Sequence, residues 1–312
     1  MGLALIFPGQ GSQAVGMGRA LAKAFPVAKA VFDEVDAALG EKLSDMIWEG
    51  PESDLMLTRN AQPALMAVSI AALRVLESEK GLDLKRDVAC VAGHSLGEYS
   101  ALAAVGSLGV GETARLLRIR GEAMQQAVPV GRGAMAALLG ADALQAQAIA
   151  REASQGEVCD VANDNGGGQV VISGAHAAIG RAIEIAKAKG VKRAMLLPVS
   201  APFHCSMMQP AADVMARALE SATISAPVVP IYANVLAAPV TDPVEIRRNL
   251  VTQVTATVRW RETMLAMSAA GVSRMVEIGS GKVLAGLVKR VAEGVTAVSV
   301  GTPDDIAVFT LA

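Results

Sequence analysis

Hydrophobic positions recur along the chain with two spacings, one typical of strands and one typical of helices. Continuous apolar runs at Gly2–Phe7 and Val88–Ala92 indicate central parallel strands that are covered on both faces. Elsewhere apolar residues recur three to four positions apart, which predicts amphipathic helices over 28–39, 62–76, 98–105 and 112–127. We expect Pro63 in the first turn of the second of these helices. Strands that alternate with helices predict an α/β fold with a parallel sheet.

The rhythm changes between about Gly133 and Val199, where strands become more frequent. The pattern there predicts strand, helix, strand, strand, helix and strand over 134–139, 143–154, 158–162, 169–173, 175–190 and 194–199. This βαββαβ order is the ferredoxin-like pattern. We therefore predict a ferredoxin-like domain of residues 131–198, inserted into a larger α/β domain of residues 1–130 and 199–312. For the last part of the larger domain the pattern predicts helices over 207–221, 243–253, 257–270 and 283–291, and strands over 228–232 and 274–277.

The composition indicates a soluble protein with a large core. Of the 312 residues, 52% are hydrophobic and 19% are charged, and the net charge is −2. This charge gives no general attraction for nucleic acid or anionic membranes, and 3% aromatic residues offer little base stacking. The most apolar long window, Val88–Val110, contains His94 and Glu98, which argues against a membrane span. Three widely spaced cysteines without a C-x-x-C pair predict a reducing compartment, the cytoplasm, with no metal cluster and no disulfide.

A serine lies where the second predicted strand passes into a helix. The segment Gly93-His94-Ser95-Leu96-Gly97 matches the G-x-S-x-G nucleophile elbow. Small flanking residues let the turn close, and the serine oxygen then stands at a helix N-terminus, where amide N–H groups stabilise an oxyanion. An ordinary glycine-rich loop is the alternative interpretation. The strand before the motif and the helix after it favour a nucleophile.

A nucleophilic serine needs a base, and the chain has three histidines. His94 adjoins Ser95, but successive side chains on a tight turn point apart, so we expect it to support the turn. His176 lies early in a predicted helix of the small domain and is expected to be solvated. Elimination favours His204, in a proline-bounded loop after a strand. No Asp or Glu in a comparable loop stands out as the third member of a catalytic triad. Either a backbone carbonyl orients His204, or the sequence does not reveal the partner.

Two further segments could supply polar groups to such a site. The glycine-rich turn Gly9–Gln13 follows the first strand, and Gln10 is either part of a simple turn or a donor to the oxyanion site. The helix over 112–127 carries Arg115, Arg118 and Arg120. A buried arginine would clamp a substrate carboxylate through paired N–H donors, whereas most helix arginines are solvated. The residues alone do not choose among the three arginines.

Taken together, these motifs resemble one known family. The segments GQGSQ, GHSLGEYSA, RGEAMQ, PVSAPFHC and EIGSGKVLAGL occur in this order. The chain closely resembles malonyl-CoA:acyl carrier protein transacylases from Phe7 to about Pro303. The resemblance implies a hydrolase-like α/β catalytic domain with a ferredoxin-like insertion, as the pattern also predicts. One position departs from the family's usual EVGPGKVL, because Ser280 replaces proline, and we expect this to change loop stiffness more than chemistry.

The resemblance also implies a role for individual residues. Ser95 corresponds to the nucleophile, His204 to the base, and Arg120 to the partner of the malonyl carboxylate. The remaining implied roles are an oxyanion hole from Gln10 and the backbone N–H of Leu96, a backbone carbonyl of Gln253 that orients the histidine, and pocket positions at Met124, Asn163 and Phe203.

The activity implied by the resemblance is a ping-pong acyl transfer that supplies fatty acid biosynthesis. Malonyl-CoA would acylate Ser95, and the phosphopantetheine thiol of acyl carrier protein would remove the malonyl group. We expect no metal, no resident cofactor, no nucleic acid or membrane partner, and a monomer. Acyl carrier proteins are acidic, and the basic clusters 187–193 and 282–290 are candidate docking faces. The alternatives are a serine thioesterase, a noncatalytic carrier-binding module, and a malonyl transacylase subunit of another malonyl-using system.

Overall fold

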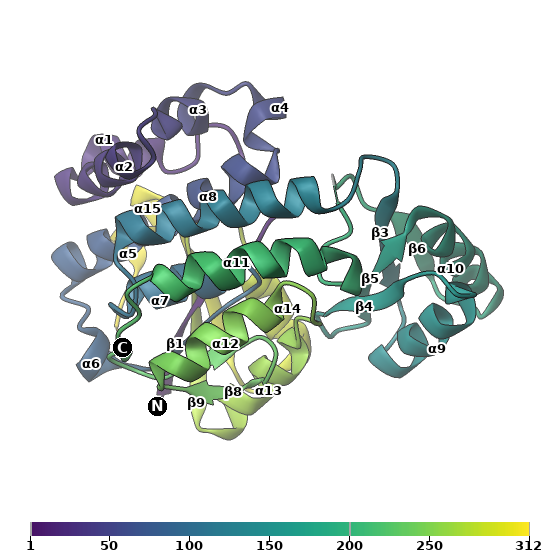
Figure 1. Ribbon diagram of the computed structural model, residues 1–312. Coiled ribbons are helices and arrows are strands. Elements are labelled where there is room, and N and C mark those ends of the chain that lie inside the picture. Colours follow the sequence, from purple (N-terminus) through teal and green to yellow (C-terminus); the bar gives the residue numbers. More distant parts are fainter. Residues whose placement is uncertain (1, 200, 312) are drawn as a thin grey trace.

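The computed structural model describes residues 2–199 and 201–311, so Ser200 of the PVSAPFHC segment lies outside the described residues. Its larger sheet has six strands in the order β10-β9-β1-β2-β7-β8 (Figure 1). All neighbours are parallel except β7 and β8, which confirms the predicted α/β fold. The strands are β1 (Gly2–Phe7), β2 (Val88–Gly93), β7 (Ile231–Ala233), β8 (Ala238–Val240), β9 (Val272–Ile278) and β10 (Thr296–Val300).

Helices cover both faces of this sheet (Figure 1). Leu5 and Phe7 of β1 point into one core, and Ala4 and Ile6 point into the other. Both faces of the central strands are therefore buried, which explains why their sequences are continuously apolar. The helices of this domain are α1 (Arg19–Ala24), α2 (Pro26–Leu39), α3 (Leu43–Glu49), α4 (Glu52–Leu55), α5 (Thr58–Lys80), α6 (Leu84–Asp87), α7 (Gly97–Ala104), α8 (Val110–Ala127), α11 (Gln209–Ser221), α12 (Pro243–Gln253), α13 (Trp260–Ala269), α14 (Val283–Val291) and α15 (Pro303–Val308), with a 3₁₀ turn at Ser206–Met208.

The smaller sheet is antiparallel, with the order β4-β5-β3-β6, and it projects from the larger sheet (Figure 1). Its elements follow the predicted βαββαβ order: β3 (Gly133–Leu139), α9 (Ala143–Ser154), β4 (Cys159–Asp164), β5 (Gln169–Ala175), α10 (His176–Ala188) and β6 (Arg193–Leu196). Ala136, Leu138 and Ile172 pack with the two helices in a separate core. Met135 and Val171 point to the opposite face, toward the cavity described below.

Several predicted boundaries were wrong by three residues or more. Helix α5 begins at Thr58 instead of Gln62, so Pro63 lies inside the helix and not in its first turn. Strand β6 ends at Leu196 instead of Val199, and β7 begins at Ile231 instead of Val228. Pro198 and Pro230 limit these strands, because proline has no N–H to donate to a neighbouring strand. Helix α13 begins at Trp260, not at 257, because the backbone of Val258 bonds to Ala162 and Asp164 of β4.

The pattern also missed several short elements. Strands β8 and β10 lie at the two edges of the larger sheet, where alternate residues face solvent and no long apolar run forms. Helices α1, α3, α4, α6 and α15 have four to seven residues, too few for helical periodicity to be visible. In the part of the chain that the structure describes, no helix has both the length and the hydrophobicity needed to cross a membrane.

Candidate active site

Ser95 lies on the turn between β2 and α7, and its backbone adopts a left-handed conformation with φ 55°. Two glycines permit this turn. A Cβ on Gly93 would lie 1.8 Å from the carbonyl oxygen of Gly97, and a Cβ on Gly97 would lie 2.3 Å from the carbonyl oxygen of Phe7. Backbone strain of this kind on a non-glycine residue is concentrated at functional sites. The structure thus has the tight strand-to-helix turn that the motif predicts.

An asparagine that the sequence reasoning missed secures this turn. The side chain of Asn234, just after β7, accepts a hydrogen bond from the Ser95 N–H at 2.8 Å and donates to the Gly93 carbonyl at 2.7 Å. The Asn234 N–H donates to the carboxylate of buried Glu98 at 3.0 Å. Burial raises the pKa of Glu98 to about 7. No local pattern points to Asn234, because its bond to Ser95 joins residues 139 positions apart in the chain.

His204 lies directly against the serine. Its Nε2 atom is 2.7 Å from the Ser95 hydroxyl oxygen, and its Nδ1 atom is 2.9 Å from the backbone carbonyl oxygen of Gln253. Gln253 is the last residue of α12, so its carbonyl is one of those that the helix leaves without an intrahelical partner. Nδ1–H therefore donates to Gln253, and Nε2 is left to accept the serine proton. The partial negative charge at this helix end takes the place of an acidic third residue.

Burial and, second, the positive charge of Arg120 together lower the pKa of His204 to about 3. The imidazole is therefore neutral at physiological pH, as a general base must be. Neither of the other two histidines takes this position, although His94 lines the cavity described below. His94 bonds through Nε2 to the Asn165 side chain at 2.9 Å, and His176 is exposed at the start of α10.

Of the three candidate arginines, the structure brings Arg120 to the serine. Arg120 is 1% exposed, and its guanidinium donates to the Ser95 hydroxyl oxygen at 3.2 Å. Arg115 is exposed, and Arg118 pairs with Glu41. Helix α8 can bring Arg120 inward because Gly121 touches the start of α5, where a Cβ would lie 2.4 Å from the Cα atom of Arg59.

The remaining partners of Arg120 are neutral side chains. Its guanidinium donates to the side-chain oxygens of Gln62 at 2.7 Å and Gln253 at 2.9 Å, and it lies 5.7 Å from the ring centre of Tyr99. Gln253 thus contacts the site twice, through its backbone toward His204 and through its side chain toward Arg120. These hydrogen bonds to neutral amides do not cancel the charge of the guanidinium, and its Nε–H has no partner among the described residues, so the site can still attract an anion.

These groups share one cavity of about 540 Å³. Ser95, His204 and Arg120 line it together with the predicted positions Gln10, Leu96, Met124, Asn163 and Phe203. Gln253 lies behind His204, outside the lining. Other walls are formed by apolar residues of the small sheet, Met135 and Val171, and of α14, Leu284 and Leu287. The cavity therefore lies between the two sheets.

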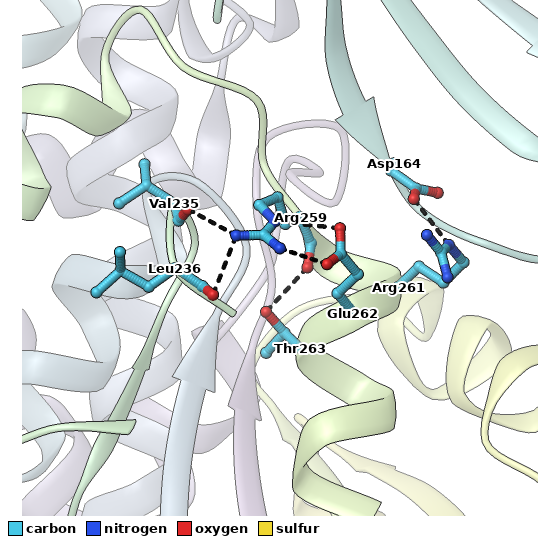
Figure 2. Close-up of polar contacts among 7 residues, drawn as sticks. All are labelled: Asp164, Val235, Leu236, Arg259, Arg261, Glu262 and Thr263. Carbon is cyan, nitrogen blue, oxygen red and sulfur yellow. Dashed lines mark hydrogen bonds and ion pairs between the residues drawn. The ribbon is translucent and has the colours of Figure 1, made fainter. Parts of the chain in front are cut away.

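Polar contacts fix the start of α13, which follows the helix that ends at Gln253. Figure 2 shows Arg259 donating to the backbone carbonyls of Val235 and Leu236, at 3.3 and 3.1 Å, and pairing with Glu262. In the same view Arg261 bonds to the carboxylate of Asp164 at 2.7 Å, which joins α13 to strand β4 of the small sheet. The two arginines hold the start of α13 against both sheets.

Ser280, which departs from the family pattern, contacts the first glycine-rich loop. Its hydroxyl donates to the backbone carbonyl of Ser12 at 2.7 Å. Ser12 lines the cavity two residues after Gln10. A proline at this position has no hydroxyl, so the serine supplies a link between loops that proline would not make.

Comparison with known proteins decides the family. Residues 4–306 match the acyl transferase domain family. The chain is 44% identical over 305 residues to the malonyl CoA-acyl carrier protein transacylase of Bacillus subtilis (strain 168), covering 97% of this chain and 95% of that protein. The chain belongs to the malonyl-CoA:acyl carrier protein transacylase family.

Solved structures of the transacylase family share the fold. The acyl-carrier-protein-S-malonyltransferase of Bartonella henselae superimposes with a TM-score of 0.96 at 56% identity, covering 98% of both chains. A malonyl-transacylase in complex with its type II polyketide synthase acyl-carrier protein superimposes with a TM-score of 0.95 at 41% identity, again covering 98% of both chains. The predicted fold class, a hydrolase-like α/β domain with a ferredoxin-like insertion, is confirmed.

Proposed function

We propose that this protein transfers the malonyl group from malonyl-CoA to the phosphopantetheine thiol of an acyl carrier protein, through an ester on Ser95, to supply fatty acid biosynthesis. One observation carries the malonyl assignment. Arg120 is buried beside the nucleophile, and its hydrogen bonds go to Ser95, Gln62 and Gln253. A buried cation at the acyl site favours an acyl group that brings its own carboxylate.

In the first half-reaction His204 Nε2 takes the hydroxyl proton while Ser95 Oγ attacks the thioester carbonyl. The backbone N–H of Leu96 and the side chain of Gln10 stabilise the oxyanion. The C–S bond then breaks, and the imidazolium returns its proton to the departing CoA thiolate. The malonyl group remains as an ester on Ser95, with its carboxylate on Arg120.

In the second half-reaction the carrier's phosphopantetheine thiol enters the cavity that CoA has left. Neutral His204 takes the thiol proton, and the thiolate attacks the ester carbonyl. The bond between the carbonyl carbon and Ser95 Oγ breaks, and Ser95 recovers the proton from the imidazolium. Malonyl leaves as a thioester of the carrier.

A turnover assay separates this reaction from the alternatives. Purified protein is mixed with malonyl-CoA, with or without holo acyl carrier protein, and malonyl-carrier and free malonate are measured. The proposal expects malonyl-carrier to form much faster than malonate. Rapid malonate formation without a thiol would identify a thioesterase. Carrier binding without acyl transfer would identify a binding module.

The lowered pKa of His204 predicts a flat pH profile. Because the folded-state pKa is about 3 instead of 6.5, the imidazole stays neutral as the pH falls through 6.5. Single-turnover loading of Ser95 by malonyl-CoA should therefore change less than about threefold between about pH 8 and pH 5. Circular dichroism at each pH controls for unfolding. A loading rate that falls tenfold per pH unit below 6.5 would contradict the proposed environment of the base.

We propose the basic cluster that includes the end of α14 as the docking face for an acidic carrier. Helix α14 lines the cavity, and its last turn exposes Lys289 and Arg290. In the other cluster, Lys187 and Lys189 are paired with Glu184 and Glu152, at 2.6 and 2.8 Å, which offsets their charge.

Charge reversal tests this preference. Lys289→Glu with Arg290→Glu should raise the KM for the carrier about tenfold at low salt and leave loading by malonyl-CoA unchanged. Lys187→Glu with Lys189→Glu is the matched control on the other cluster. An unchanged KM in the first variant, or an equal rise in the control, would exclude α14 as the preferred docking face.

A further inference from the structure

A chain of hydrogen bonds connects the arginine of the site to the first glycine-rich loop. Arg120 donates to the Gln62 side-chain oxygen at 2.7 Å, and the Gln62 amide nitrogen donates to the Thr58 hydroxyl oxygen at 2.9 Å. The Thr58 hydroxyl then donates to the side-chain oxygen of Gln10 at 2.8 Å. Three bonds therefore link the carboxylate-binding group to the residue expected to face the oxyanion.

Each bond in this chain has a fixed direction. A guanidinium only donates, so Gln62 must turn its oxygen to Arg120 and its amino group to Thr58. A threonine hydroxyl has one proton, and its oxygen already accepts the hydrogen bond from Gln62. Its proton therefore goes to Gln10. The oxygen of Gln10 is held by Thr58, which leaves the Nε2 amino group as the free donor.

Burial makes the directions difficult to reverse. Thr58 is fully buried and Gln62 is 1% exposed, so water does not replace a lost partner. A polar group left unpaired at such depth destabilises the fold. Both residues lie on α5, four positions apart and on the same face of the helix. The early start of α5 at Thr58, which the sequence pattern missed, is what places the threonine in this row.

We propose that Thr58 and Gln62 are positioning residues. They turn the amino group of Gln10 toward the oxyanion and fix the position of this amino group relative to Arg120. This inference rests on the proposed function and extends it to two residues outside the expected site. The substrate carboxylate and the reacting carbonyl are then bound by one set of side chains that hydrogen bonds connect. Because any acyl thioester forms an oxyanion, Thr58 should affect malonyl and acetyl loading equally, unlike Arg120.

Two substitutions of Thr58 separate its hydroxyl from its packing. Thr58→Val keeps the shape and removes the hydroxyl, whereas Thr58→Ser keeps the hydroxyl and removes a methyl group. Single-turnover loading of Ser95 is measured by rapid quench and intact mass, with saturating malonyl-CoA and with acetyl-CoA. The valine variant should load about 10–100-fold more slowly with both thioesters, and the serine variant within about threefold of wild type. Wild-type loading by the valine variant, or an equal loss in the serine variant, would overturn the proposal.

A double-mutant cycle keeps the test decisive even if Thr58→Val is destabilised. If Thr58 acts through Gln10, Thr58→Val should add no further loss of loading rate in a Gln10→Ala background. Additive losses would overturn the proposal. The two proposals fail separately. The proposed function depends on whether the wild type prefers malonyl, whereas the role of Thr58 depends on the ratio of variant to wild-type rates with any thioester that loads.

Discussion

Replacement of His204 by alanine is expected to slow loading of Ser95 by malonyl-CoA by about 10⁴-fold. The Nε2 atom lies 2.7 Å from the serine oxygen, and the variant leaves no other base at that distance among the described residues. Without a base the hydroxyl must attack as a neutral alcohol, a far weaker nucleophile. The rate is measured by quenched-flow acylation at saturating malonyl-CoA.

His176→Ala is the matched control, because His176 is exposed on α10 and should leave the rate unchanged. Thermal unfolding of both variants shows whether the fold is kept. A His204→Ala variant that remains folded and loads within tenfold of wild type would remove the histidine from the mechanism.

Replacement of Arg120 by alanine is expected to remove the preference for malonyl over acetyl. Malonyl loading should fall by about 10³-fold, because the substrate carboxylate would enter a buried site without its cation. Acetyl loading should not fall, because acetyl has no carboxylate to lose a partner. The ratio of kcat/KM for malonyl-CoA to that for acetyl-CoA measures the effect directly.

Two further arginine variants sharpen this test. Arg120→Lys keeps the positive charge but lacks the planar pair of donors, so its selectivity should be intermediate. Arg115→Ala removes an exposed arginine of the same helix and should leave the selectivity at the wild-type value. If Arg120→Ala lowers malonyl and acetyl loading by the same factor, Arg120 supports the site without reading the carboxylate.

Features coded by neighbouring residues could be predicted from the sequence. The turn around Ser95 needs Gly93 and Gly97, which lie two residues to either side, so the motif carries its own geometry. The βαββαβ order of the small sheet likewise follows from successive local patterns. His204 emerged by elimination, because the chain has only three histidines.

Features that depend on contacts between distant segments could not be predicted. Asn234 bonds to Ser95 across 139 positions, and Arg120 reaches Gln62 across 58. The group of Gln253 that contacts His204 is a backbone carbonyl, which every residue has, so only the family resemblance indicates this position. The local pattern predicts a helix at Val258, because the hydrogen bonds of Val258 to β4 are long-range and leave no mark on the neighbouring sequence. In each case the deciding partner is supplied by the fold.

The covalent intermediate on Ser95 is the central claim, and intact-protein mass after mixing with malonyl-CoA tests it most directly. Wild type, Ser95→Ala and an acetyl-CoA sample are compared, and a pantetheine thiol is then added. We predict a malonyl adduct on the wild type alone, weak acetyl loading, and loss of the adduct to the thiol. No adduct on the wild type, or an adduct that persists in Ser95→Ala, would contradict the acyl-serine mechanism.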